Sequence, residues 1–107
     1  MVVQRPPLLD RLAPERRGEL YYLTMQDHYV EVVTSNGTSL VLLRLADAIK
    51  ETAPLDGVQI HRSHWVARNA VRETERQGDR LVVKMANGIT LPVSRSRRNA
   101  LKDAGLL

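Results

Sequence analysis

The chain has 107 residues, of which 43% are hydrophobic and 26% are charged, and its formal net charge is +4. This length favours a single domain with one modest core, without room for a catalytic domain beside a regulatory one. The absence of cysteine excludes disulfides, thiolate zinc sites, iron–sulfur clusters and cysteine nucleophiles. Because no apolar run approaches the length of a membrane span and residues 1–7 lack a signal-peptide core, we expect a cytoplasmic protein with no membrane segment.

The positive charge is concentrated in the second half of the chain. Residues 1–60 contain six Lys or Arg and eight Asp or Glu, a balance of −2. Residues 61–102 contain ten Lys or Arg and three Asp or Glu, a balance of +7. Such asymmetry is typical of a protein with a polyanionic partner. A basic surface that is merely solvated would give the same counts, and this alternative stays open.

The first 18 residues are expected to form a lead-in or linker, with the domain itself spanning residues 19–107. This segment contains three prolines and ends at Gly18. Leu8, Leu9 and Leu12 are expected to touch the domain through a short turn of helix.

Strands and one helix are predicted next. Residues 20–25 and 28–34 have strand composition, and Asn36-Gly37 is a strong hairpin signal before the apolar run at 40–43. Apolar residues then recur at steps of three and four, which predicts a helix at about residues 43–52. Pro54 disfavours helical backbone at the residue before it and ends this helix.

The second half of the chain is predicted to return to β-structure. Residues 71–76 are charged and alternating, which is typical of an exposed or edge strand, and residues 77–79 form a turn. Residues 81–85 form a strand with Leu81, Val83 and Met85 on one face. Asn87-Gly88 is a second hairpin signal, and Pro92 restricts the strand at 89–93 to an edge. A short helix is expected between residues 96 and 104, with Gly105 as its stop.

The chain offers no pattern that indicates catalysis, a metal site or a cofactor. His61 and His64 are three residues apart, and in a strand such residues face opposite sides, so we do not expect them to share a metal ion. Ser63 lies between these histidines, but no nucleophile-elbow motif surrounds it. A glycine-rich phosphate loop is also absent from the sequence. We therefore expect that the protein is not an enzyme and uses no cofactor.

Two segments place an Arg beside a Ser at the edge of an apolar run. They are Ile-His-Arg-Ser-His-Trp-Val at residues 60–66 and Leu-Pro-Val-Ser-Arg-Ser-Arg-Arg at residues 91–98. An Arg can fork two donors to a guanine edge or a phosphate, and a Ser can bond a phosphate oxygen. Arg97 and Arg98 fall in the first predicted helical turn, where the helix dipole disfavours cations but free amides favour an anion. A phosphate at this point would explain the pattern, and a fortuitously basic tail is the alternative.

Five motifs, taken in order and spacing, resemble the LytTR-type DNA-binding domain, the output module of LytR/AlgR/AgrA-like response regulators in two-component signalling. They are Asp-His-Tyr-Val-Glu-Val at 27–32, Asn-Gly at 36–37, Leu-Arg-Leu-Ala-Asp-Ala at 43–48, His-Arg-Ser-His-Trp-Val at 61–66 and Asn-Gly-Ile-Thr-Leu-Pro-Val-Ser-Arg at 87–95. The resemblance covers about residues 19–104. It implies a mainly β fold, an elongated antiparallel β structure of small stacked sheets with one helix between strands and a short C-terminal helix, which agrees with the predicted elements.

The resemblance also implies sequence-specific binding of double-stranded DNA by a bacterial transcription regulator, whose loops read the major groove of tandem direct repeats. By position, the base contacts would fall to His28, Arg62 and Arg95. The phosphate contacts would fall to Ser63, His64, Arg68, Asn69, Ser94, Ser96, Arg97, Arg98 and Lys102. One departure is Ala67, where the family often has Asn, so any contact made by that Asn would be lost or taken over by Arg68 or Asn69.

Several expectations about partners and single residues complete this interpretation. Domains of this type usually follow a receiver, sensor or membrane segment, so we expect that the switch either lies on a segment outside this sequence or does not exist. Without a heptad pattern the domain is expected to be a monomer in solution, with two copies on one DNA site. The alternative function is a protein-interaction or sensory β module whose basic face binds a partner or an anionic ligand. Tyr29 and Trp65 are expected in the core, His61 is expected to pack or bond backbone, and the arginines at 72, 76 and 80 are expected to be solvated.

Overall fold

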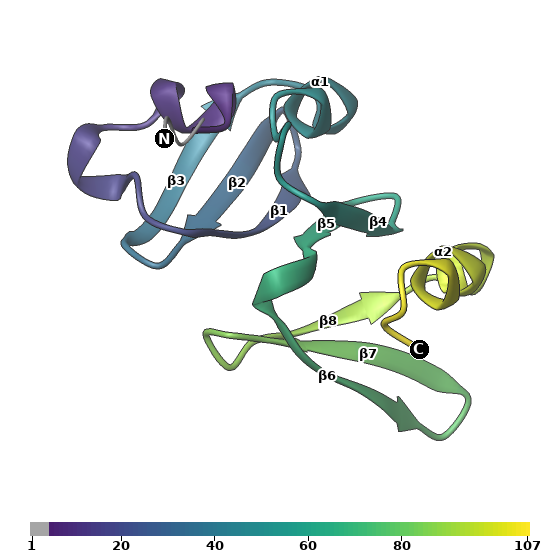
Figure 1. Cartoon of the computed structure of the whole chain (residues 1–107). Coiled ribbons are helices and arrows are strands. Elements are labelled where there is room, and N and C mark those ends of the chain that lie inside the picture. Colours follow the sequence, from purple (N-terminus) through teal and green to yellow (C-terminus); the bar gives the residue numbers. More distant parts are fainter. Residues whose placement is uncertain (1–4) are drawn as a thin grey trace.

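The computed structural model describes residues 5–107, and Met1–Gln4, the first part of the predicted lead-in, lie outside the described residues. Within the described part, eight strands form two antiparallel sheets (Figure 1). The five-stranded sheet has the order β3-β2-β1-β5-β4, and the three-stranded sheet has the order β6-β7-β8. One helix lies between β3 and β4, and a short helix ends the chain. The predicted fold class is therefore confirmed.

The bounds of the elements are as follows. The strands of the larger sheet are β1 (Leu20–Gln26), β2 (Tyr29–Thr34), β3 (Gly37–Leu42), β4 (Gly57–His61) and β5 (His64–Ala67). Those of the smaller sheet are β6 (Val71–Gln77), β7 (Arg80–Met85) and β8 (Thr90–Val93). The α-helices are α1 (Leu45–Lys50) and α2 (Arg98–Asp103). Short 3-10 helices are η1 (Pro7–Arg11), η2 (Pro14–Arg16), η3 (Arg68–Ala70) and η4 (Arg95–Arg97).

Both Asn-Gly signals mark tight turns between antiparallel strands. Gly37 has a φ of 125° and Gly88 a φ of 87°, values that glycine reaches without a steric penalty. A further turn was not predicted: Asp27 and His28 form the β1–β2 turn, with Asp27 at a φ of 52°. The predicted strand start at His28 is therefore wrong by one residue, because β2 begins at Tyr29.

Helix α1 is shorter than predicted at both ends. Arg44 before it has extended backbone, and Glu51 after it already leaves the helix. Leu45 and Ala48 face the core, as the helical spacing of the apolar residues predicts. Six residues are enough here because tertiary packing, more than intrinsic propensity, stabilises a helix of this length.

A single cluster of buried apolar side chains joins the two sheets and the short helices. The largest side chains with no exposed surface are Leu8, Leu23, Ile60, Met85, Leu101, Val30, Val32, Val66 and Val83. The prediction that Leu81, Val83 and Met85 share one buried face is confirmed. Leu101 of α2 packs in the same cluster, so the C-terminal helix is part of the core.

The N-terminal segment is attached to α1. Leu8, Leu9 and Leu12 are all buried, so the expected contact of this segment with the domain is confirmed, with η1 as the short helical turn. The Leu8 amide donates to the carbonyl of Glu51 at 3.1 Å. The Arg11 guanidinium makes a two-pronged pair with the Glu51 carboxylate, with N···O distances of 2.7 and 2.8 Å.

Strands β4 and β5 were not assigned as elements from the sequence, and a glycine allows their close packing. Trp65 is buried, as predicted, and its ring lies over Gly57. A Cβ at Gly57 would lie 2.0 Å from Trp65 Cζ2, so a larger residue would force the hairpin or the ring to move. This hairpin carries the His-Arg-Ser-His segment at its tip.

The prediction that Tyr29 lies in the core is wrong, because its side chain is 46% exposed. Neighbouring residues of a strand point to opposite faces, and Val30 takes the inward position with no exposed surface. Tyr29 therefore points outward, opposite Leu42 on the edge strand β3.

The C-terminal elements follow the prediction closely. Strand β8 lies at the edge of its sheet, as Pro92 requires. The predicted helix at 96–104 is split into η4 and α2, and Gly105 ends it with a φ of 76°. Among the described residues, no helix is both long and apolar enough to cross a membrane.

Candidate nucleic-acid interface

The three predicted base-contacting side chains lie at three points where the chain reverses direction. His28 is in the β1–β2 turn, Arg62 is in the β4–β5 turn, and Arg95 follows β8 as the first residue of η4. All three are exposed. Because each one is attached to the end of a sheet strand, its backbone is held in place while its side chain is free to reach a ligand.

Backbone hydrogen bonds place these three reversals side by side. The Met25 amide, near the end of β1, donates to the carbonyl of Ser63 in the β4–β5 turn at 2.8 Å. On the other side of that turn, the Ser94 amide donates to the carbonyl of Ile60 at 2.9 Å. The second bond joins the two sheets, since Ile60 lies in β4 and Ser94 follows β8. The structure thus brings together segments that are more than 30 residues apart in the sequence.

His61 and His64 are partners across the β4–β5 turn, and their ring centroids are 5.1 Å apart. The expectation that they face opposite sides is therefore wrong, because the two-residue turn between them folds the strand back on itself. The described residues nevertheless contain no group of three or more His, Asp or Glu that could hold a metal ion.

The Nδ1 atoms of His61 and His64 have different hydrogen-bond partners. His61 Nδ1 accepts the Ser63 amide at 3.1 Å, so the expected backbone bond of His61 is confirmed. His64 Nδ1 lies 3.2 Å from the Thr24 hydroxyl of β1. Burial, and then the neighbouring His61, lower the pKa of His64 from its ordinary value of 6.5. His64 is consequently neutral at pH 7 and contributes no positive charge to the site there.

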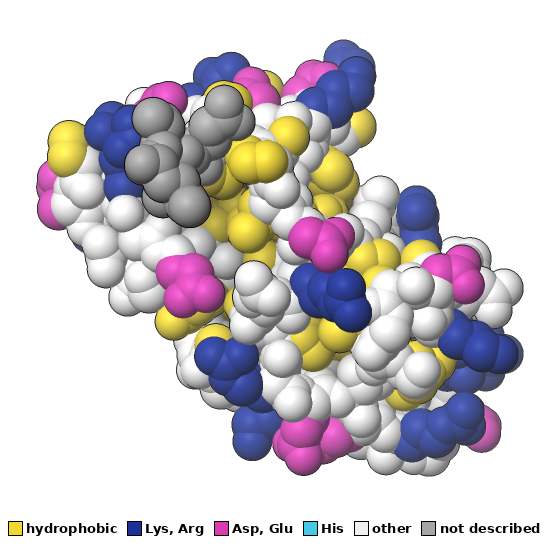
Figure 2. Space-filling model, viewed as in Figure 1, with side chains coloured by type: hydrophobic (Ala, Val, Ile, Leu, Met, Phe, Trp, Pro, Cys, Tyr) yellow, Lys and Arg dark blue, Asp and Glu magenta, His cyan; other side chains and the backbone are white. Residues whose placement is uncertain are grey.

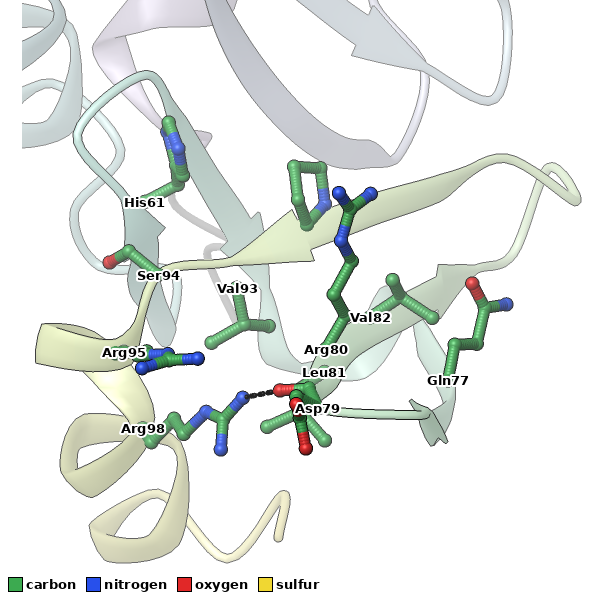
Figure 3. Close-up of a pocket in the computed structure, with 11 residues that line it drawn as sticks. His61, Gln77, Asp79, Arg80, Leu81, Val82, Val93, Ser94, Arg95 and Arg98 are labelled. Carbon is green, nitrogen blue, oxygen red and sulfur yellow. Dashed lines mark hydrogen bonds between the residues drawn. The ribbon is translucent and has the colours of Figure 1, made fainter.

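A cleft of about 590 Å³ lies between the β4–β5 hairpin and the smaller sheet. Arg95 of η4 and Arg98 of α2 both line this cleft, and Figure 3 shows them projecting from the same helical segment. Arg98 Nη2 donates to the Asp79 carbonyl at 2.6 Å, which ties α2 to the β6–β7 turn. The buried Nε of Arg98 has no hydrogen-bond partner among the described residues. Arg98 therefore has a structural bond as well as a basic group facing the cleft.

Arg80 and Asp79 also line this cleft, and the sequence did not indicate their role. Arg80 is exposed, as are Arg72 and Arg76, which agrees with the expected solvation of these side chains. Nothing in the local sequence separates Arg80 from its neighbours. Only the packing of the β6–β7 turn near α2 brings it to the Arg95 side of the molecule.

The predicted phosphate-contacting residues fall into two groups. Ser63, His64, Ser94, Ser96, Arg97, Arg98 and Lys102 lie in or directly after the three reversals, or on α2. Arg68 and Asn69 lie in η3, beyond the opposite end of β5, where Arg68 pairs with Asp56 at 3.5 Å. The structure therefore places Arg68 and Asn69 away from the candidates in the β4–β5 turn.

The basic side chains do not form one continuous patch on the face shown in Figure 2. They are spread over that face and interleaved with acidic side chains. The excess of positive charge in the second half of the chain consequently does not by itself define a binding surface. The reversals that carry the exposed Arg62 and Arg95, whose segments are joined by backbone hydrogen bonds, define the candidate interface more closely.

Comparisons with known proteins agree with this geometry. A family model described as the LytTr DNA-binding domain matches residues 11–105. Among solved structures, the chain is similar to one described as the LytTr DNA-binding domain of a methyl-accepting/DNA response regulator from Bacillus cereus. That similarity has a TM-score of 0.71 and 21% sequence identity, and it covers 79% of each chain. No curated protein matches the chain.

Proposed function

The chain belongs to the LytTr DNA-binding domain family, and we propose that it binds double-stranded DNA in a sequence-specific manner as part of a bacterial transcription regulator. The observation that carries the specific part of this proposal is the juxtaposition of His28, Arg62 and Arg95 at three bonded chain reversals. Side chains projecting from neighbouring loops can enter a major groove without a recognition helix. Such a regulator would act in the cytoplasm and would have no catalytic role.

In this proposal the exposed arginines read bases. An Arg can bond both acceptors of a guanine edge at once, which is worth about 1–3 kcal/mol of discrimination. Arg62 and Arg95 lie next to the ends of β4 and β8, so little backbone freedom is lost when they bind. His28 would read a neighbouring base from the β1–β2 turn.

The polar groups around the reversals would hold the phosphates. These are Ser63, His64, Ser94, Ser96, Arg97, Arg98 and Lys102. Arg68 and Asn69 would contact phosphates only on a DNA that extends past the opposite end of β5. Arg98 would do so with the part of its guanidinium that is not bonded to Asp79.

A second candidate function is supported by the arginine-lined cleft. A basic cleft of about 590 Å³ is large enough for a small anionic ligand. A sensory or protein-interaction module of this kind would bind its ligand without a preference among DNA sequences, which separates it from the first proposal.

Selection from a random duplex library with this chain tests the proposal directly. We expect recovery of a preferred site made of tandem direct repeats. The His-Arg-Ser and Ser-Arg-Ser-Arg-Arg segments with Lys102 offer about five to seven phosphate-neutralising groups, so affinity should fall with a log–log slope of about −4 to −6 against salt. Anisotropy measurements that give no preferred duplex and a slope near zero would contradict DNA binding.

Arginine variants test the assignment of roles. Arg62→Ala and Arg95→Ala should each cost about 1–3 kcal/mol on the preferred site and relax the preference at one base position. Arg97→Ala should weaken binding to all duplexes about equally and reduce the salt slope by about one. Arg97 is a cleaner phosphate control than Arg98, because Arg98→Ala also removes the bond to Asp79. If Arg97→Ala changes the preferred base while Arg95→Ala does not, the roles are assigned wrongly.

A further inference from the structure

The β4–β5 turn contains a hydrogen bond that depends on the protonation state of a histidine. His61 Nδ1 accepts the backbone N–H of Ser63, two residues further along, at 3.1 Å. An imidazole nitrogen accepts a hydrogen bond only while it carries no proton. The bond to Ser63 therefore requires His61 to be neutral, with its proton on Nε2. The N–H of Ser63 and a protonated Nδ1 would both be donors and would repel each other.

This bond has the form of a well-known turn device. Asn and Asp side chains stabilise turns by accepting the N–H of the residue two positions on. His61 makes the same connection with a ring nitrogen in place of a side-chain oxygen. Unlike the oxygen of an Asn, however, a ring nitrogen stops accepting when it takes up a proton. The turn is thus built with an acceptor that protonation removes.

The residues enclosed by this bond are those that face the DNA in the proposed function. Arg62 lies between His61 and Ser63, and its side chain is exposed. The carbonyl of Ser63 also accepts the Met25 amide, so the same turn is bonded to β1. A change in the turn would consequently alter the direction of Arg62 relative to His28 and Arg95, which are held by neighbouring strands.

The surroundings of His61 contain several other charged or titratable groups. His64 faces it from β5, with the ring centroids 5.1 Å apart. The cleft that His61 lines is also lined by Asp79 of the β6–β7 turn, Arg80 of β7, Arg95 of η4 and Arg98 of α2. A proton on His61 therefore enters a site that already holds three arginines and one carboxylate.

We propose that His61 is a positioning residue for Arg62, and that protonation of His61 releases the Arg62–Ser63 turn and lowers the sequence preference of DNA binding. The inference rests on the proposed function, since the preference is read through Arg62. Acidification adds positive charge and so favours binding to any duplex. This general effect is the same for a preferred and a scrambled duplex, so it cancels in the ratio of the two affinities. The ratio therefore measures the sequence preference that depends on the position of Arg62.

The test uses the full chain and three substitutions, with both duplexes measured at pH 7.5 and 5.5 in the same salt. For the wild type, the affinity ratio should fall by roughly fivefold or more on acidification, the effect of losing one base contact. His61→Ala should have the low ratio at both pH values. His61→Asn should keep the high ratio at both, because its amide oxygen accepts the same N–H and does not titrate. Lys84→Gln, which changes an exposed side chain of β7 outside the proposed site, is the control and should keep the pH dependence of the wild type.

A double variant distinguishes positioning from a general loss of structure. If His61 acts through Arg62, His61→Ala added to Arg62→Ala should lower the ratio no further. An additional loss in the double variant, a His61→Ala ratio equal to that of the wild type, or a His61→Asn ratio as low as that of His61→Ala would each overturn the proposal.

A measurement without DNA keeps this inference separate from the proposed function. In NMR spectra of the free chain, the Ser63 amide proton should shift upfield as the His61 ring takes up a proton, and His61→Asn should show no such shift. A Ser63 amide that does not respond to His61 titration refutes the positioning role. If instead the amide responds but no duplex is preferred at either pH, the proposed function fails and the link to DNA recognition fails with it.

Discussion

At the scale of single residues, the environment of His64 decides how the fold responds to mild acid. Its ring is half-buried beside Thr24 and His61, and burial is the main reason that its pKa is lowered. The folded state therefore binds a proton less readily than the unfolded state does. Because of this difference, the contribution of neutral His64 to the free energy of unfolding is complete above the ordinary pKa of 6.5. It is lost as the pH falls through the lower pKa of His64 in the folded state.

We therefore expect the free energy of unfolding to decrease between pH 7.5 and pH 5.5. His64→Gln should make this decrease smaller, because the titrating group is removed. Urea denaturation at a series of pH values measures both effects. The pKa of Glu51 is also lowered, but from 4.5, so its titration lies below this window. A His64→Gln variant with an undiminished pH dependence would show that another group is responsible.

At the scale of elements, η1 behaves as a component of the domain core and not only as a linker. Leu8 has no exposed surface, and its amide is bonded to the end of α1. The Arg11–Glu51 pair lies over the same junction but is largely exposed, so solvent screens it and it adds little. Burial of the leucines is thus the main interaction that holds η1 in place.

Leu8→Ala should consequently destabilise the whole chain by about 2–5 kcal/mol, the usual cost of deleting a buried leucine side chain. Leu42→Ala is a matched control, since Leu42 is 69% exposed and should change stability by less than about 0.5 kcal/mol. Denaturant unfolding of both variants gives the comparison. Equal, small effects would mean that residues 1–18 are a dispensable lead-in.

At the scale of the whole molecule, the arrangement of the two sheets leaves β3 and β6 as the outer strand edges. Strand β4 is covered on the other side of the larger sheet, where it contacts β8 and α2. Strand β6 is protected against edge pairing by its many charged residues. Strand β3 is less protected, because Leu40 and Leu42 are exposed on it.

We expect the free chain to be a monomer at micromolar concentration, since two exposed leucines on a short edge strand form a small apolar surface. On a duplex with two direct repeats, two copies should bind. Light scattering of the free chain and of the complex measures both masses. A stable free dimer would contradict this prediction, and loss of that dimer in Leu40→Lys would identify β3 as its interface.

Most of the local structure follows from short stretches of the sequence. Strand composition placed β1 and β2, alternation of apolar residues placed β7, and the two Asn-Gly pairs placed the turns after β2 and β7. These signals are short-range, since they depend on backbone preferences and on the period of side-chain direction. The family resemblance, carried by motifs in the same elements, was confirmed for the same reason.

The tertiary structure decided which of these elements meet. The bonds from Met25 to Ser63 and from Ser94 to Ile60 join distant segments, and they follow from a strand order that no local pattern encodes. The pairing of His61 with His64 depended on a tight turn inside a stretch that strand periodicity would have kept straight. In each case a candidate site residue could be named from the sequence, but its neighbours could not, because they come from segments that only packing brings together.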